Sequence, residues 1–172
     1  MPFRFARIFL AVSAALALAA CTFDGDQQPS LYRSLAVSGA ELDANSAASM
    51  ISGYRGNNGL SAVTIDPVLM QLANEQARIM AERDKLDHNV SRDFRERIRA
   101  SGFDAKIAVE NISAGYHTLA EAFSGWRDSP PHRANMLKSG VTRMGIAAVR
   151  SPNSKYKVFW TLILAAPDDR KS

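Results

Sequence analysis

Apolar positions recur every three or four residues in several stretches of the chain, as in helices that bury one face. The clearest stretch opens with Asp66 and Pro67, an N-cap followed by a first-turn proline, and should end near Arg83 or Leu86. Three further helices are predicted: between Glu41 and Arg55, from Ser91 as cap to Gly102, and from Thr118 to about Asp128.

The period changes in the C-terminal third of the chain. Met144 to Val149 and Tyr156 to Ala165 are rich in branched and aromatic residues, and the intervening segment contains Ser151-Pro152-Asn153. They predict an antiparallel hairpin whose second strand is apolar on both faces, so helices should cover it on both sides. A shorter strand is expected from Ile107 to Ile112, followed by a turn at Ser113-Ala114-Gly115. The fold class is therefore α+β, with a small antiparallel sheet between helical layers.

The N-terminus has the pattern of a bacterial secretory signal. A basic start with Arg4 and Arg7 precedes an apolar run that is too short to span a bilayer. Leu18-Ala19-Ala20-Cys21 then resembles a lipobox, and Cys21 is the only cysteine among 172 residues. We expect a signal peptide over residues 1–20, lipidation of Cys21, a flexible linker over 21–39, and one domain over 40–168. An ordinary cleaved signal with an incidental cysteine is the alternative.

Charge argues against nucleic-acid binding. Removal of the leader, with its two arginines, lowers the formal net charge from +4 to +2. Arg92, Arg95, Arg97 and Arg99 form a basic run, but acidic residues are interleaved with them and no aromatic ladder accompanies them. We interpret this run as a solvated helix face.

Two of the three histidines lie beside predicted helix ends. A second short helix is expected behind Ser129 as N-cap, with Pro130 or Pro131 in its first turn, which places His132 near a helix N-terminus. The partial positive charge there disfavours an imidazolium, so this ring should stay neutral. His88 follows the end of another helix, where it could bind a ligand or simply complement the helix C-terminus.

Several motifs together resemble the CAP superfamily, which includes the cysteine-rich secretory proteins, antigen 5 and plant pathogenesis-related proteins. The resemblance covers about residues 45 to 166 and is to the cysteine-poor bacterial branch. Ser52 departs from the usual Asn and Val109 from a frequent Gly. The motifs that carry the resemblance are Gly53-Tyr54-Arg55, His88, Glu110-Asn111-Ile112, Trp126, Ser129-Pro130-Pro131-His132-Arg133, Asn135-Met136-Leu137, Met144-Gly145-Ile146-Ala147 and Trp160-Thr161.

The resemblance implies an α-β-α sandwich with a cleft lined by His88, Glu110, Glu121 and His132. Two neutral imidazoles and water can bind a zinc-like divalent ion weakly, and a carboxylate can orient a ring or accept a proton. Asn111, Arg133 and Asn135 are expected to hold the cleft loops by hydrogen bonds. Ser113 and Ser129 occur in turn and cap contexts and are not expected to be nucleophiles, and His117 matches no position of the family.

Three functions remain open. The first is a membrane-anchored extracytoplasmic domain, in the outer membrane if the host has one, that binds a metal and a small lipid or glycan ligand. The second is a metal-assisted hydrolase with His88 and His132 as ligands and Glu110 or Glu121 as general base. The third is an envelope interaction protein in which the same residues form a stabilising polar network.

Overall fold

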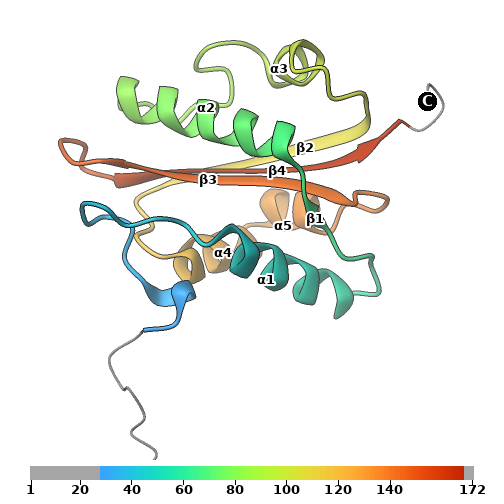
Figure 1. The fold of residues 1–172 in the computed structure, drawn as a ribbon, viewed down its shortest axis with the longest axis horizontal. Helices are drawn as coiled ribbons and strands as arrows, with labels where there is room; N and C mark the ends of the chain where they lie inside the picture. Colours follow the sequence, from blue (N-terminus) through green and yellow to red (C-terminus); the bar gives the residue numbers. More distant parts are fainter. Residues whose placement is uncertain (1–27, 169–172) are drawn as a thin grey trace, which may run out of the picture.

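The protein is a three-layer sandwich with its sheet in the middle. The computed structural model describes residues 28–168, so the predicted signal peptide and Cys21 lie outside the described residues. Helices α2 and α3 cover one face of the sheet, and α1, α4 and α5 cover the other (Figure 1). This arrangement is the predicted α-β-α sandwich. The helices span α1 Ala44–Gly56, α2 Pro67–Arg83, α3 Phe94–Ala100, α4 Leu119–Asp128 and α5 Pro130–Met136.

The sheet has four strands in the order β1-β3-β4-β2, and both β3–β4 and β4–β2 are antiparallel. The strands span β1 Thr64–Ile65, β2 Ala105–Ala114, β3 Arg143–Ser151 and β4 Lys157–Pro167. The predicted hairpin and its central second strand are confirmed. The sequence did not reveal β1, which pairs in parallel with β3 and is too short to show a period. The predicted turn at Ser113 and Ala114 is wrong, because both residues extend β2 and pair with β4.

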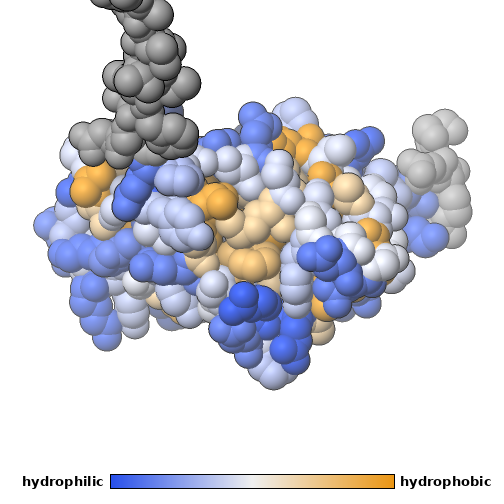
Figure 2. Space-filling model, turned by 90° about the horizontal axis from the view of Figure 1, so that it is seen from below, coloured by the Kyte–Doolittle hydropathy of each residue, from blue (hydrophilic) through white to orange (hydrophobic). Residues whose placement is uncertain are grey.

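The alternating side chains of β4 divide the core. Val158, Trp160 and Leu162 pack in the cluster beneath the sheet with residues of α1 and α4, whereas Ile163 packs in the cluster above it with α2. The face seen in Figure 2 shows hydrophobic residues near its centre, bordered by hydrophilic ones. Burial on both faces explains why the sequence of β4 is a nearly continuous apolar run.

Helix starts follow local capping chemistry. The side chains of Asp43, Asp66, Asp93 and Thr118 accept backbone N–H bonds at the starts of α1 to α4. The expected cap at Ser91 is therefore wrong, because Asp93 caps α3 two residues later. Ser129 does stand at the N-cap of α5, but its side chain makes no capping bond there.

None of the helices between residues 28 and 168 has both the length and the apolar character that a membrane crossing requires.

The described end of the predicted linker packs against the domain. Leu35 is buried in the lower core and its N–H donates to the carbonyl of His117 at 2.7 Å. Arg150 donates from Nε to the carbonyl of Ala36 at 2.8 Å. A short 3-10 helix, Ser30–Tyr32, precedes these contacts. One buried apolar side chain, one backbone–backbone bond and one bond from the Arg150 side chain thus attach residues 35 and 36 to the domain.

A buried arginine connects α1 to the end of α5. Arg55 is fully buried and donates to four backbone carbonyls, including those of Met136 and Val141 at 2.8 and 3.1 Å. Burial lowers the pKa of Arg55. Arg55 thus holds the end of α5 and the segment after it by hydrogen bonds from within the layer formed by α1, α4 and α5. Helix α5 is the one that carries His132.

Candidate functional site

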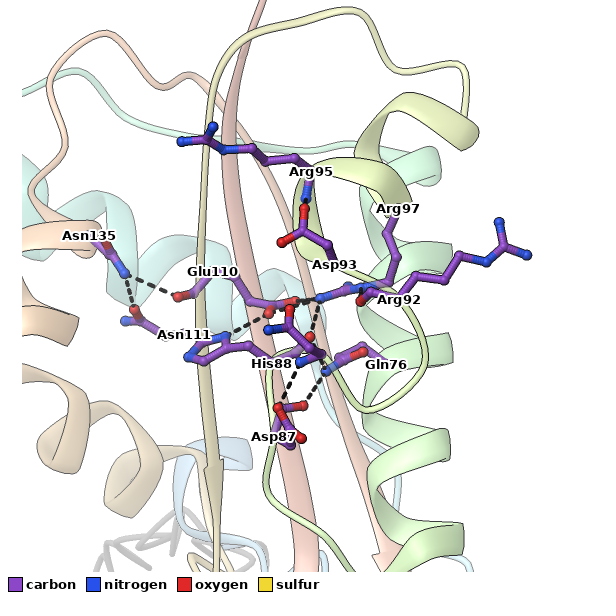
Figure 3. Close-up of polar contacts among 11 residues, drawn as sticks. Gln76, Asp87, His88, Arg92, Asp93, Arg95, Arg97, Glu110, Asn111 and Asn135 are labelled. Atoms are coloured by element: carbon purple, nitrogen blue, oxygen red, sulfur yellow. Dashed lines mark hydrogen bonds and ion pairs between the residues drawn. The ribbon is translucent and has the colours of Figure 1, made fainter.

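Glu110 is the centre of a polar cluster on β2. Its side chain is only 2% exposed. Nη2 of Arg97 lies 2.8 Å from Oε2 and 3.0 Å from Oε1, and Nδ1 of His88 lies 2.8 Å from Oε1 (Figure 3). Both carboxylate oxygens therefore accept hydrogen bonds, which suits the ionised form of this buried acid.

Arg97 corrects the interpretation of the basic run as a solvated helix face. The side chain of Arg97 is 6% exposed, whereas Arg92, Arg95 and Arg99 are exposed. Its guanidinium also lies 5.2 Å from the ring centroid of Phe94. The signal was in the sequence, because Arg97 stands three residues after Phe94 and one before Ile98, on the apolar stripe of α3.

His88 is fixed at both its ring and its backbone. Its carbonyl accepts from Nη2 of Arg97 at 3.1 Å and from Nε2 of the buried Gln76 at 3.2 Å. Because an ionised carboxylate can only accept, Nδ1 of His88 carries the hydrogen in its contact with Glu110. In the neutral ring the lone pair is then on Nε2, and the side chain is 48% exposed. His88 thus has the tautomer and the solvent exposure that a metal-coordinating imidazole requires.

His132 lies on α5 and is half-buried. Burial lowers its pKa, and the positive charge that His88 can carry lowers it further. This direction agrees with the neutral ring expected from the sequence, and burial is its largest cause. The two rings lie within electrostatic reach of each other, and the neutral form of His132, the form able to bind a metal, is favoured.

Two asparagines connect α5 to β2. Asn135 donates from Nδ2 to the carbonyl of Glu110 at 3.0 Å and to Oδ1 of Asn111 at 2.9 Å, and Asn111 donates to the carbonyl of His132 at 3.0 Å. This chain of bonds sets His132 against the strand that carries Glu110. Arg133 is exposed. The pKa of Asp128 is lowered first by its hydrogen bond with Arg127, and the charge of Arg133 makes the smallest contribution.

Glu121 has a structural task at the start of α4. Its Oε2 accepts from the N–H of His117 at 2.6 Å and from that of Thr118 at 3.0 Å, while Thr118 Oγ1 accepts from the N–H of Glu121. This is a complete capping box. The Thr-x-x-Glu spacing signalled it in the sequence, and our sequence analysis did not use that signal. The structure brings together His88, Glu110 and the region of His132, and places Glu121 in a separate role.

The donor set suits only an open metal site. Among residues 28–168, no three His, Cys, Asp or Glu side chains lie close enough together to hold a metal ion. His88 and His132 supply two imidazoles, and water would have to complete the coordination. Glu110 accepts a hydrogen bond from Nδ1 of His88, and many metal sites have a carboxylate in this position beside a metal-coordinating histidine.

Comparisons with known proteins agree with this fold. A model of CAP, the cysteine-rich secretory protein family, matches residues 48–164. The uncharacterized protein YkwD of Bacillus subtilis is 29% identical over 105 residues, which are 59% of this chain and 40% of that protein. The chain therefore spans less than half of the length of this relative.

Solved structures show the same fold at low identity. An extracellular protein containing an SCP domain from Bacillus anthracis matches 71% of this chain and 39% of its own, with a TM-score of 0.62 and 20% identity. An outer surface protein from Borrelia burgdorferi matches 76% of this chain and 99% of its own, with a TM-score of 0.66 and 18% identity.

Proposed function

Since this chain belongs to the CAP family, we propose that it acts outside the cytoplasm and binds one divalent, zinc-like ion through His88 and His132. Two similar solved proteins are named as an extracellular and an outer surface protein, which supports the location. Metal binding rests on the chemistry of this chain's own residues. When bound, such an ion supplies a Lewis acid or an activated water.

One observation carries the metal proposal: the 2.8 Å contact between Nδ1 of His88 and the buried carboxylate of Glu110. It selects the tautomer whose Nε2 is free to bind. Arg97 and Gln76 fix the backbone of the same residue, so little conformational entropy is lost when a ligand binds. With two imidazoles and no third protein ligand, the site should be weak.

Binding has more structural support than hydrolysis. A general base must reach the water or substrate whose proton it takes. Glu110 is buried and both of its oxygens accept hydrogen bonds, and the carboxylate of Glu121 caps α4. Neither candidate base is free beside the two imidazoles, so a metal-assisted hydrolase is the second interpretation of this site.

Zinc titration calorimetry tests the proposal on a form of the chain that begins after Cys21. Wild type should bind about one equivalent, and His88→Ala and His132→Ala should each abolish that binding while remaining folded. His117→Ala is the matched control, because His117 is exposed and outside the cluster. Unchanged zinc binding in both variants, or none in wild type, would contradict the metal site.

A purely structural role for the cluster gives a different result. If the residues only stabilise the fold, His88→Ala should lower the melting temperature, and zinc should not raise the melting temperature of wild type. Ligand binding to the native state raises it by mass action. Thermal melts with zinc and with EDTA therefore separate the two roles without an assay for activity.

Membrane anchoring through Cys21 is part of the same proposal. Its support is the lipobox-like Leu18-Ala19-Ala20-Cys21. In a bacterial host, a Cys21→Ser variant should lose both the incorporation of a labelled fatty acid and its place in the membrane fraction. A variant that still fractionates with the membrane would show another means of attachment. A small lipid or glycan ligand remains an expectation.

A further inference from the structure

One edge of the sheet is open along the first half of β2. β2 pairs only with β4, so its other side has no neighbouring strand. Asn135 covers that edge at the carbonyl of Glu110. Within residues 28–168, no hydrogen bond from a loop or from a side chain reaches the backbone of residues 106–109.

The hydrogen bond from Asn135 also shows which backbone groups of β2 point away from β4. In an antiparallel pair, the residues whose N–H and C=O point away from the partner strand alternate along the strand. Because the carbonyl of Glu110 points outward, the N–H and C=O of Ala108 also do so. Ala108 faces Ala165 in the register, without a bulge between it and Glu110. Ala108 thus offers one donor and one acceptor at the open edge.

A groove runs along this edge, between α3 and β2. Its volume is about 540 Å³. The apolar part of its lining includes Phe94 and Ile98 from α3 and Ile107 and Val109 from β2. Ile98 is buried, and the other three are half-buried. The groove therefore combines an apolar surface with an unpaired strand edge.

The charged residues at this groove have one sign. Arg95, Arg99, Lys106 and Lys138 line it, and none of its described lining residues is acidic. Asp104 lines a smaller hollow beside it. Four cations around an apolar surface complement a ligand that carries several carboxylates.

We infer that this groove binds an extended, acidic polypeptide segment, which adds a strand to the open edge of β2. Its backbone would pair with Ala108, its apolar side chains would enter the groove, and its carboxylates would meet the four cations. An acyl chain would fill the apolar part equally well, but it would leave the N–H of Ala108 unpaired. The outward backbone groups therefore favour a peptide over a lipid. This site does not depend on the metal proposal.

A blocked synthetic hexapeptide that alternates Glu and Val is the probe, and fluorescence anisotropy of a labelled copy measures its affinity for the full chain. A Lys–Val peptide should not bind. An N-methylated Glu–Val peptide should bind about two- to tenfold more weakly, since a lost hydrogen bond is worth roughly 0.5–1.5 kcal/mol and about 1.4 kcal/mol is tenfold in affinity. Equal binding of the methylated peptide would overturn strand addition.

Ala108→Pro tests the same contact from the protein side. Proline is tolerated on edge strands where its nitrogen faces outward, so the ladder to β4 should survive while the outward donor is lost. Should this variant fail to fold, Lys106→Glu and Lys138→Glu replace it, because both side chains are exposed. Each should weaken Glu–Val binding severalfold, and Lys155→Glu, on the exposed β3–β4 hairpin, should leave it unchanged.

Two results would overturn the inference. If the wild-type chain binds none of these peptides, then Lys106 and the register irregularity beside it only protect the edge from pairing. If vesicles with anionic headgroups bind instead, and Lys106→Glu abolishes that binding, the groove recognises a lipid surface and not a peptide.

Discussion

Nη2 of Arg97 lies 2.8 Å from Oε2 of Glu110, and both side chains are almost completely buried. Arg97 comes from α3 and Glu110 from β2, so the pair connects the upper helical layer to the sheet. The same guanidinium also bonds the carbonyl of His88. The stability of the fold and the orientation of His88, the candidate metal-coordinating residue, therefore depend on the same ion pair.

Breaking this pair should destabilise the protein strongly. Arg97→Met leaves a buried carboxylate without its cation, and Glu110→Gln leaves a buried cation without its carboxylate. Each should cost about 3–5 kcal/mol of unfolding free energy. The double variant should cost less than the sum of the two, because it leaves no unpaired buried charge. Urea unfolding measures all three.

Arg95→Met is the matched control for this cycle. It removes an exposed arginine from the same helix and should change the unfolding free energy by less than about 0.5 kcal/mol. Additive single and double variants would mean that Arg97 and Glu110 do not stabilise each other.

His132 should make stability depend on pH. Its pKa is lowered in the folded protein, mainly by burial. The unfolded chain therefore takes up a proton at pH values near 6.5 where the folded chain does not. The stability from His132 is complete above about pH 6.5 and declines as the pH falls toward its lowered folded pKa. Melting temperatures between pH 5 and 8, in EDTA, should show this loss.

The His132→Gln variant removes the group that titrates. Its melting temperature should fall less between pH 7 and pH 5 than that of wild type. His117→Gln, at an exposed histidine outside the cluster, is the matched control. An identical pH dependence in wild type and His132→Gln would assign the effect to other groups.

Glu121 should matter for stability and not for metal binding. Glu121→Ala removes half of the capping box of α4 and should cost about 1 kcal/mol, similar to Thr118→Ala. Zinc affinity should remain that of wild type in both variants. A large loss of zinc affinity in Glu121→Ala alone would place its carboxylate at the metal, contrary to its contacts in this structure.

Periodicity predicted most of the fold, because α2, α4 and the β3–β4 hairpin bury regular stripes against one another. It failed where an element was too short to have a period. β1 has two residues, and the cap of α3 depends on which of Ser91 and Asp93 reaches the helix. Side-chain geometry decides which of the two residues reaches the first backbone N–H groups of α3, and the spacing of residues in the sequence does not determine that geometry.

The candidate site was only partly predictable. His88, Glu110 and His132 could be named because family motifs mark them. Arg97 and Gln76, which fix His88 and Glu110, carry no motif, and the basic run that contains Arg97 was interpreted as a solvated helix face. Their roles depend on contacts between segments far apart in the chain, which the local pattern does not encode.

Gly145 should be intolerant of any side chain. It lies on β3 under α2, and a Cβ placed there would be 2.1 Å from the carbonyl carbon and oxygen of Leu69 and 2.5 Å from the backbone nitrogen of Met70. These backbone atoms belong to a helix and cannot rotate away, so Gly145→Ala must push α2 off the sheet, at a cost of about 3 kcal/mol or more. Gly53→Ala is the control: it faces open space in the interior of α1 and should stabilise the protein by roughly 0.5–1 kcal/mol. Urea unfolding of both variants checks the contrast, and equal stability would mean that α2 does not pack this closely on β3.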